Sequence, residues 1–233
     1  MKRILSIVLS FIMLLTMSIN VSAAETVNKN LNEEYQNYNN LIEEGILSND
    51  ITFDFWQEIK EQSAQLEKAL ETSEEFHNVY DSNYTSDYSM EAGDIFITNG
   101  TTFGGLTGHS GIAISSDRIL HIAGFGEHPD TLTLSEWNSE YTAKGWTKVY
   151  RTDFWHAAFG AALWAKNTYL NSNAEYQIDL NLSSTNKTYC SKLVWQAYYY
   201  GPHFHYADKP ITNIILPYDL HNKIWNLKRK KVY

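Results

Sequence analysis

The sequence has a single cysteine, Cys190, among 233 residues. One thiol cannot form an internal disulfide, so Cys190 is a buried filler residue, an intermolecular link or a reactive group. The sequence also has only one long apolar run, at its N-terminus, and no cysteine follows that run closely. These absences argue against a disulfide-stapled fold, a second membrane segment and a lipid-anchored form.

The N-terminal run is typical of a secretory signal peptide. A positively charged start precedes the apolar residues 4–17, and residues 21–23 (Val-Ser-Ala) supply the small side chains that a signal peptidase reads. The run is shorter than the roughly 20 residues needed to span a bilayer. We therefore expect a signal peptide over 1–23, cleaved near Ala23, and a secreted or cell-wall-associated protein without stable membrane insertion.

The chain has no excess of positive charge with which to bind nucleic acid. It has 18 Lys and Arg against 27 Asp and Glu, and signal-peptide cleavage takes the net charge from −9 to −11. Binding to phosphate backbones requires Lys and Arg. The basic run 228–231 is interpreted as a solvated tail. The sequence has no internal repeat, low-complexity segment or recognisable wall-binding repeat.

Residues 24–88 have the pattern of a helical accessory region that ends in a linker. Apolar residues recur at helical spacing before and after Gly45. Residues 80–89 are rich in Ser, Asp, Asn and Tyr and have no periodicity. We expect a helical hairpin that packs on the following domain, and the alternative is an independent binding module.

Residues 89–233 combine strand patterns with later helices. Residues 109–114 and 119–123 alternate on either side of the turn Ser115-Ser116-Asp117, which predicts an antiparallel hairpin. Further strands are expected at 94–98, 131–134 and 146–151, and helices at 153–170 and 188–200. The predicted fold class is α+β.

Cys190 lies in the first turn of the helix predicted for 188–200. We expect Thr188 to cap this helix, and Cys190 to share its buried stripe with Leu193 and Ala197. A helix N-terminus carries roughly +0.5 charge, which favours a thiolate. Free cysteine is also among the most buried residue types, so this segment alone leaves filler and nucleophile equally open.

A nucleophilic thiol needs a base, and His109 and His121 are the candidates. They lie twelve residues apart on the two strands of the predicted hairpin, and an even register would place both rings on one face. Gly111 and Ala113 on that face would leave room for a helix to approach. No metal is expected, because the His203-x-His205 pair lacks a third ligand at fixed spacing.

Four motifs in a fixed order resemble the permuted papain-like cysteine amidases. These are the YaeF/YiiX-type and YycO-like relatives of the NlpC-type cell-wall peptidases. The motifs are GDIFIT (93–98), GHSGIAI (108–114), ILHIAG (119–124) and YCSKLVWQAY (189–198). In unpermuted relatives the cysteine helix comes first, whereas enzymes of the lecithin–retinol acyltransferase type share the His-then-Cys order seen here. The resemblance covers 90 to about 220 and implies an antiparallel sheet packed against the cysteine helix.

The resemblance also implies the roles of the site residues. Cys190 would be the nucleophile, His109 its base and His121 the polar third residue that orients the base. Tyr189 would help to hold the substrate carbonyl. Many relatives have an acidic residue at the third position, and the acidic alternatives are Glu127 and Asp130. No cofactor is implied.

Three functions fit these residues. The first is an exported amidase that cleaves a peptide or a peptidoglycan fragment, and export without an anchor favours it. The second is a thiol acyltransferase or esterase that acts on lipid, and the third is a catalytically silent binding module on the same fold.

Overall fold

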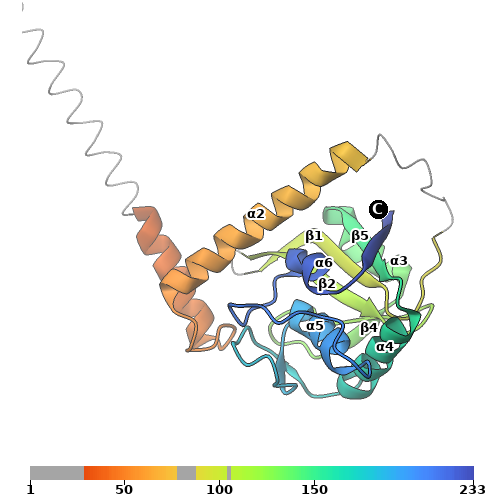
Figure 1. The fold of residues 1–233 in the computed structure, drawn as a ribbon. Coiled ribbons are helices and arrows are strands. Elements are labelled where there is room, and N and C mark those ends of the chain that lie inside the picture. Colours follow the sequence, from red (N-terminus) through yellow and green to blue (C-terminus); the bar gives the residue numbers. More distant parts are fainter. Residues whose placement is uncertain (1–28, 78–87, 104–105) are drawn as a thin grey trace, which may run out of the picture.

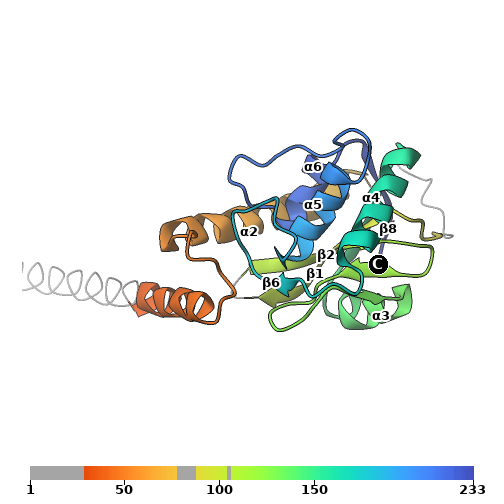
Figure 2. The ribbon, with the colours of Figure 1, turned by 90° about the horizontal axis from the view of Figure 1, so that it is seen from below.

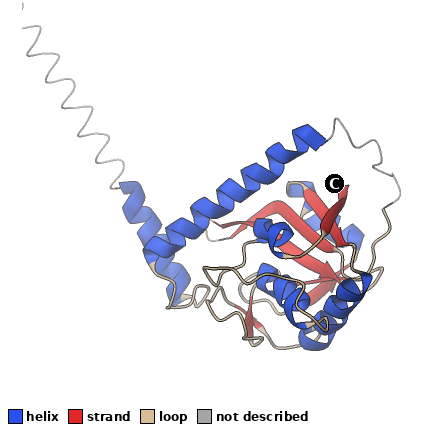
Figure 3. Ribbon diagram, viewed as in Figure 1, coloured by secondary structure: helices blue, strands red, loops and turns tan. Residues whose placement is uncertain are grey.

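The computed structural model describes residues 29–77, 88–103 and 106–233. Its centre is a six-stranded antiparallel sheet with the order β4-β3-β2-β1-β5-β8 (Figures 1 and 3). The strands are β1 Ile95–Phe103, β2 Leu106–Ala113, β3 Ile119–His121, β4 Asp130–Leu132, β5 Thr147–Thr152 and β8 Leu227–Val232. The antiparallel sheet with helices on its faces confirms the predicted α+β class.

Helices come before and after the strands in the chain. They are a helix over 29–43, α2 Phe53–His77, α3 Leu134–Glu140, α4 Trp155–Tyr169, α5 Cys190–Tyr200 and α6 Leu220–Lys223. Two 3-10 turns, η1 Thr142–Lys144 and η2 Pro217–Asp219, and a small parallel pair, β6 Glu175–Tyr176 and β7 Lys187–Thr188, complete the described part.

The sheet is buried on both faces. Figure 2 shows α4 and α5 on one side of the strands and α3 on the other. Alternate residues of β1 divide accordingly, because successive strand side chains point to opposite faces. Ile95 and Ile97 join the larger core with α4 and α5, whereas Phe96 packs with Trp137 of α3 in a second core.

Helix α3 was not predicted from the sequence. Thr133 and Glu136 form a capping box, in which the Thr133 hydroxyl accepts from the Glu136 amide and the Glu136 carboxylate accepts from the Thr133 amide. This cap fixes the start of a seven-residue helix whose Trp137 is fully buried. The helix therefore supplies one large side chain to the far face of the sheet.

Helix α2 packs on the sheet domain, as expected for the accessory region. Its residues Trp56, Ile59 and Leu70 are buried in the larger core. The Asn99 amide on β1 donates to the Glu67 carboxylate at 3.1 Å. In Figure 1, α2 extends as one long helix beside β1, β2 and α6. The predicted signal peptide, 1–23, and most of the predicted linker lie outside the described residues.

The basic run at the C-terminus is not a solvated tail. Residues 228–231 belong to β8, which pairs with β5 from Lys148↔Val232 to Thr152↔Leu227. The alternation of half-buried and exposed residues along β8 reflects a strand at the edge of the sheet. Within the described residues, no helix is long and apolar enough to cross a membrane.

Candidate active site

His109 and His121 form a hydrogen-bonded imidazole pair. His109 Nε2 lies 3.0 Å from His121 Nδ1. The hairpin register, with Ile112 opposite Leu120, places both histidines on the same face in diagonal positions. The predicted hairpin and the shared face of the two rings are thus present in the structure.

Both rings lie among aromatic side chains on the α3 face. The His109 ring stacks on Trp137 at 5.5 Å and lies 4.6 Å from the ring of Tyr141. The Tyr141 hydroxyl is 3.4 Å from His121 Nδ1. A Cβ added to Gly111 would lie 2.9 Å from the Trp137 ring. The space beside Gly111 is therefore filled by α3. The expectation that the cysteine helix would approach there is wrong, because α5 packs on the opposite face.

Burial keeps the imidazoles neutral. It lowers the pKa of His109 well below the usual 6.5, and the neighbouring His121 lowers it further. Burial also lowers the pKa of His121 to about 4, although the charge of Asp130 opposes this change. A neutral imidazole can accept a proton, which is the state that a general base requires.

The Cys190 thiol lies near the part of β2 where the pairing with β3 ends. The amide of Ile114 donates to Arg118 on the β3 side, so the amide of Ser110, four residues earlier, points to the same side. Strand β3 ends at His121, one residue short of the position opposite Ser110. The Ser110 amide therefore lies beyond the end of the ladder, where it lowers the pKa of the Cys190 thiol.

This position brings the thiol to the end of the strand that carries His121. Helix α5 packs on one face of the sheet and the imidazoles lie on the other, so the structure does not place the thiol on the face that carries His109 and His121. Burial raises the pKa of Tyr141, and the charges of Glu140 and Cys190 raise it further. Tyr141 is thus close to both imidazoles and within electrostatic reach of the thiol.

Burial also raises the pKa of the Cys190 thiol. The amide and hydroxyl of Ser110, and those of Ser191, lower it only in part. The helix N-terminus was expected to produce a thiolate, but in this structure desolvation of the sulfur has the larger effect. The resting pair is a neutral thiol and a neutral imidazole.

The thiol faces a small closed cavity. The cavity has a volume of about 20 Å³, close to the space of one water molecule. Its walls are Ile59, Gly108, Tyr176, Ile178, Tyr189, Cys190, Ser191, Ile214, Ile215 and Pro217. Most of these side chains are apolar, so the thiol is surrounded largely by hydrocarbon.

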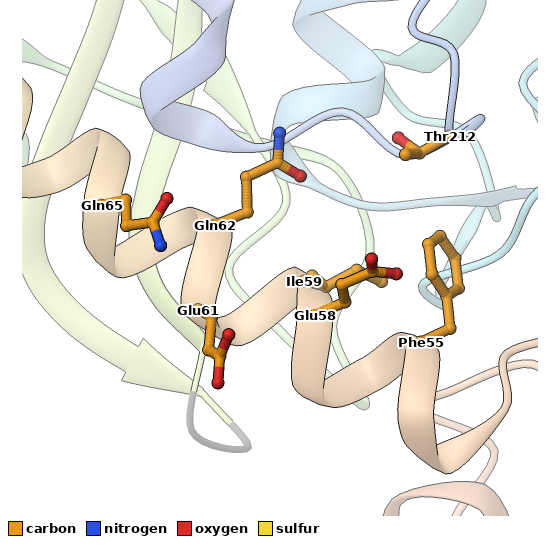
Figure 4. Close-up of a pocket in the computed structure, with 7 residues that line it drawn as sticks. All are labelled: Phe55, Glu58, Ile59, Glu61, Gln62, Gln65 and Thr212. Atoms are coloured by element: carbon orange, nitrogen blue, oxygen red, sulfur yellow. The ribbon is translucent and has the colours of Figure 1, made fainter.

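Two larger hollows adjoin this cavity. One, of about 270 Å³, lies along α2 and is lined by Phe55, Glu58, Ile59, Glu61, Gln62, Gln65 and Thr212 (Figure 4). The other, of about 340 Å³, includes Phe125, Glu127, His128, Glu175, Tyr176 and Lys187 among its walls. Ile59 borders the first hollow and the thiol cavity, and Tyr176 borders the second and the thiol cavity.

The helix start differs from the prediction. The N-cap of α5 is Tyr189, and no side chain caps the helix. Thr188 lies instead in β7, where its hydroxyl accepts from the hydroxyl of Tyr169 at 3.3 Å. The Tyr189 hydroxyl accepts from the amide of Ile215 at 3.0 Å, so Tyr189 helps to fix the cavity wall.

The two acidic alternatives lie in different places. Asp130 is opposite His121 in the β3–β4 pair and opposes the lowering of its pKa. Glu127 lines the outer hollow bordered by Tyr176. His121 bonds directly to His109, and Asp130 is its neighbour on the next strand.

Sequence reasoning did not find Ser110, Trp137 or Tyr141. Ser110 stands next to His109, but a serine in a strand gives no signal of its own. Its hydroxyl is buried and has no hydrogen bond of good geometry. Among the described residues, no group of three His, Cys, Asp or Glu side chains is arranged to hold a metal ion.

A family model described as "Lipoprotein N-acylation protein LnsA-like" matches residues 64–233. A 30.3 kDa protein of Bacillus thuringiensis is 33% identical over 229 residues, which cover 80% of this chain and 83% of that protein. The chain therefore belongs to the LnsA-like family.

One solved structure is also similar. The metalloprotein YiiX from Escherichia coli O157:H7 has a TM-score of 0.45 and 13% sequence identity, with 61% of this chain and 97% of that chain covered.

Proposed function

We propose that this protein is a cysteine acyltransferase that moves an acyl group from a lipid ester to the amine of a lipoprotein. The observation that carries the proposal is the buried Cys190 thiol at the start of α5, in a chain of the LnsA-like family whose strands β2 and β3 also hold a neutral imidazole pair. The description of that family supplies the acceptor class. The His-then-Cys order, which lecithin–retinol acyltransferase-type enzymes share, supports the same reaction.

In the first step, the proposal requires that the Cys190 thiol and His109 Nδ1, which lie on opposite faces of the sheet in this structure, come within reach, and His109 then takes the thiol proton. Its Nε2 is engaged with His121, and the proposal requires that Nε2 carry the proton donated to His121. The Cys190 sulfur attacks the ester carbonyl, and the new C–S bond replaces the C–O bond. The departing alcohol takes the proton back from His109, which leaves an acyl thioester on Cys190.

In the second step, the acceptor amine attacks the thioester carbonyl. A C–N bond forms, the C–S bond breaks, and the amine proton passes through His109 to the sulfur. The uncapped amides at the start of α5 can stabilise the oxyanion of both steps, and one such donor is worth roughly 3 kcal/mol.

The cavities favour transfer over hydrolysis. The thiol cavity has space for about one water and mostly apolar walls, which would slow hydrolysis of the thioester. The hollows behind Ile59 and Tyr176 offer separate approaches for a donor and an acceptor. A hydrolase needs only one organic substrate.

The second candidate is a cysteine amidase of NlpC type that cleaves cell-wall peptides. The motif order over 93–198 supports it. Water would then replace the amine in the second step. For either reaction we propose that the protein is exported through the signal peptide over 1–23 and acts outside the cytoplasm.

The test is a product assay with both substrate classes. Purified protein is incubated with a phospholipid donor and a diacylated lipopeptide that has a free N-terminal amine, and in parallel with muropeptides. We expect N-acylated lipopeptide by mass spectrometry, and none with Cys190→Ala. Cleaved muropeptides without any N-acylated product would establish the amidase instead. An inactive protein that binds either substrate with unchanged affinity after Cys190→Ala would identify a binding module.

A further inference from the structure

Helix α4 presents a row of large apolar side chains to the surface. Trp155, Phe159 and Leu163 follow each other at four-residue spacing, and Trp155 is 77% exposed and Phe159 58% exposed. The opposite side of α4 consists of alanines packed against α5. The helix is therefore apolar all round, although one side has no partner within the described chain.

Neighbouring segments extend this row into a patch. A Cβ added to Gly160 would lie 3.1 Å from Pro202, so the chain after α5 runs beside α4 and brings Phe204, which is 70% exposed, toward it. At the start of α4, His156 bonds to the Tyr206 hydroxyl at 2.6 Å. Tyr206 in turn contacts the half-exposed Trp225. We call the patch of Trp155, Phe159, Leu163, Phe204 and Trp225 the aromatic face.

The helices that form the aromatic face are poor in acidic residues compared with the whole chain. Residues 154–169 and 190–207 contain no Asp or Glu, although the chain has 27 acidic residues. Lys166 is exposed in the last turn of α4. Lys228 lies at the other end, 2.6 Å from Asp153, and Lys230 is exposed further along the same strand. The apolar patch is therefore flanked by lysines and also by two carboxylates, since Asp153 pairs with Lys228 and Asp208 accepts from the Trp225 indole at 3.0 Å.

We propose that the aromatic face docks on an anionic phospholipid bilayer. Trp and Phe partition into the headgroup region, and lysines beside them are attracted to anionic lipids by about 1 kcal/mol each. The aromatic side chains would enter the interface without spanning it. A patch of this kind is rare on proteins that bind no partner, and the lysines, together with the lack of Asp and Glu in residues 154–169 and 190–207, favour a negatively charged surface over an ordinary protein surface.

The aromatic face lies beside the helix that carries the thiol. Helix α5 runs eleven residues from Cys190 to Tyr200, about 16 Å at 1.5 Å per residue. Trp164 on α4 stacks against Tyr200 at 5.7 Å. Docking would thus hold the catalytic cavity about one short helix from lipid. The inference goes beyond the proposed function, since docking does not depend on which acyl acceptor is used.

The test is sedimentation of the full chain with lipid vesicles. We expect binding to vesicles of phosphatidylglycerol, weaker binding to phosphatidylcholine, and weaker binding at high salt. The double variant Trp155→Ala/Phe159→Ala should bind at least about tenfold more weakly. Ile211→Ala, at a fully exposed apolar residue away from the face, is the matched control and should bind like wild type.

Two further measurements decide between outcomes. The rate with a soluble short-chain ester should not change in the double variant, which separates docking from catalysis. Phe204→Asp provides an independent change if the double variant does not fold. Equal vesicle binding by wild type and both variants would overturn the proposal. The proposal would also be overturned if the wild type binds no vesicles but forms a dimer by analytical ultracentrifugation, and the variants do not form this dimer.

Discussion

Because the imidazole pair is buried, the protein should lose stability in acid, and a substitution of His121 should remove much of this loss. The pKa of His121 is lowered from 6.5 to about 4 in the folded protein. As the pH falls through this range, the unfolded chain takes up a proton that the folded chain does not. The contribution of His121 to the free energy of unfolding is therefore fully present above about pH 6.5 and decreases as the pH falls toward 4. At 1.36 kcal/mol per pH unit, His121 alone accounts for a loss of about 3 kcal/mol. His109 acts in the same direction, because its pKa is lowered too.

The assay is urea unfolding followed by tryptophan fluorescence between pH 4 and 7.5. His121→Gln keeps a hydrogen-bonding side chain but cannot titrate, so wild type should lose about 3 kcal/mol more than this variant between pH 7 and 4. The exposed His203 serves as the control, and His203→Gln should follow wild type. The same pH dependence in wild type and His121→Gln would refute the reasoning, because His121 would then titrate as a solvated side chain.

Two more predictions concern activity and access to the thiol. On either substrate class, Cys190→Ala and His109→Ala should each reduce kcat/KM at least about a thousandfold, and His121→Ala less, because the third residue only orients the base. If His121→Ala leaves kcat/KM unchanged and Glu127→Ala reduces it, Glu127 rather than His121 is the residue that orients the base. Iodoacetamide labelling of Cys190 should increase only above about pH 8.5, because burial raises the thiol pKa. Ile59→Ala should accelerate labelling by opening the cavity wall. Rapid labelling of wild type at pH 6 would contradict the neutral thiol.

The imidazole pair was accessible to sequence reasoning because strand geometry is local. Because His109 and His121 are an even number of residues apart across a tight turn, both can lie on the same face of the hairpin. The observed register places His109 Nε2 3.0 Å from His121 Nδ1. The cysteine at a helix start followed from the same kind of pattern. The predicted strands and the two later helices occur in the structure with boundaries shifted by a few residues.

Features that depend on long-range packing were not predictable in this way. The choice of sheet face for α5 depends on Trp137, which comes from a helix of only seven residues. The raised thiol pKa depends on walls such as Ile59 and Ile215, which are far from Cys190 in the sequence. The basic residues 228–231 resemble a tail because nothing in the neighbouring sequence shows that β5 has a free edge with which they can pair.

The most direct test of the account is to trap the acyl-enzyme. Wild-type protein is incubated with a phospholipid ester without any amine, and the intact protein is analysed by mass spectrometry. The account predicts an added acyl mass on Cys190 that disappears when a lipopeptide amine is supplied and is absent from Cys190→Ala. An unmodified Cys190 in a preparation that still forms N-acylated product, or an acyl mass retained in Cys190→Ala, would contradict it.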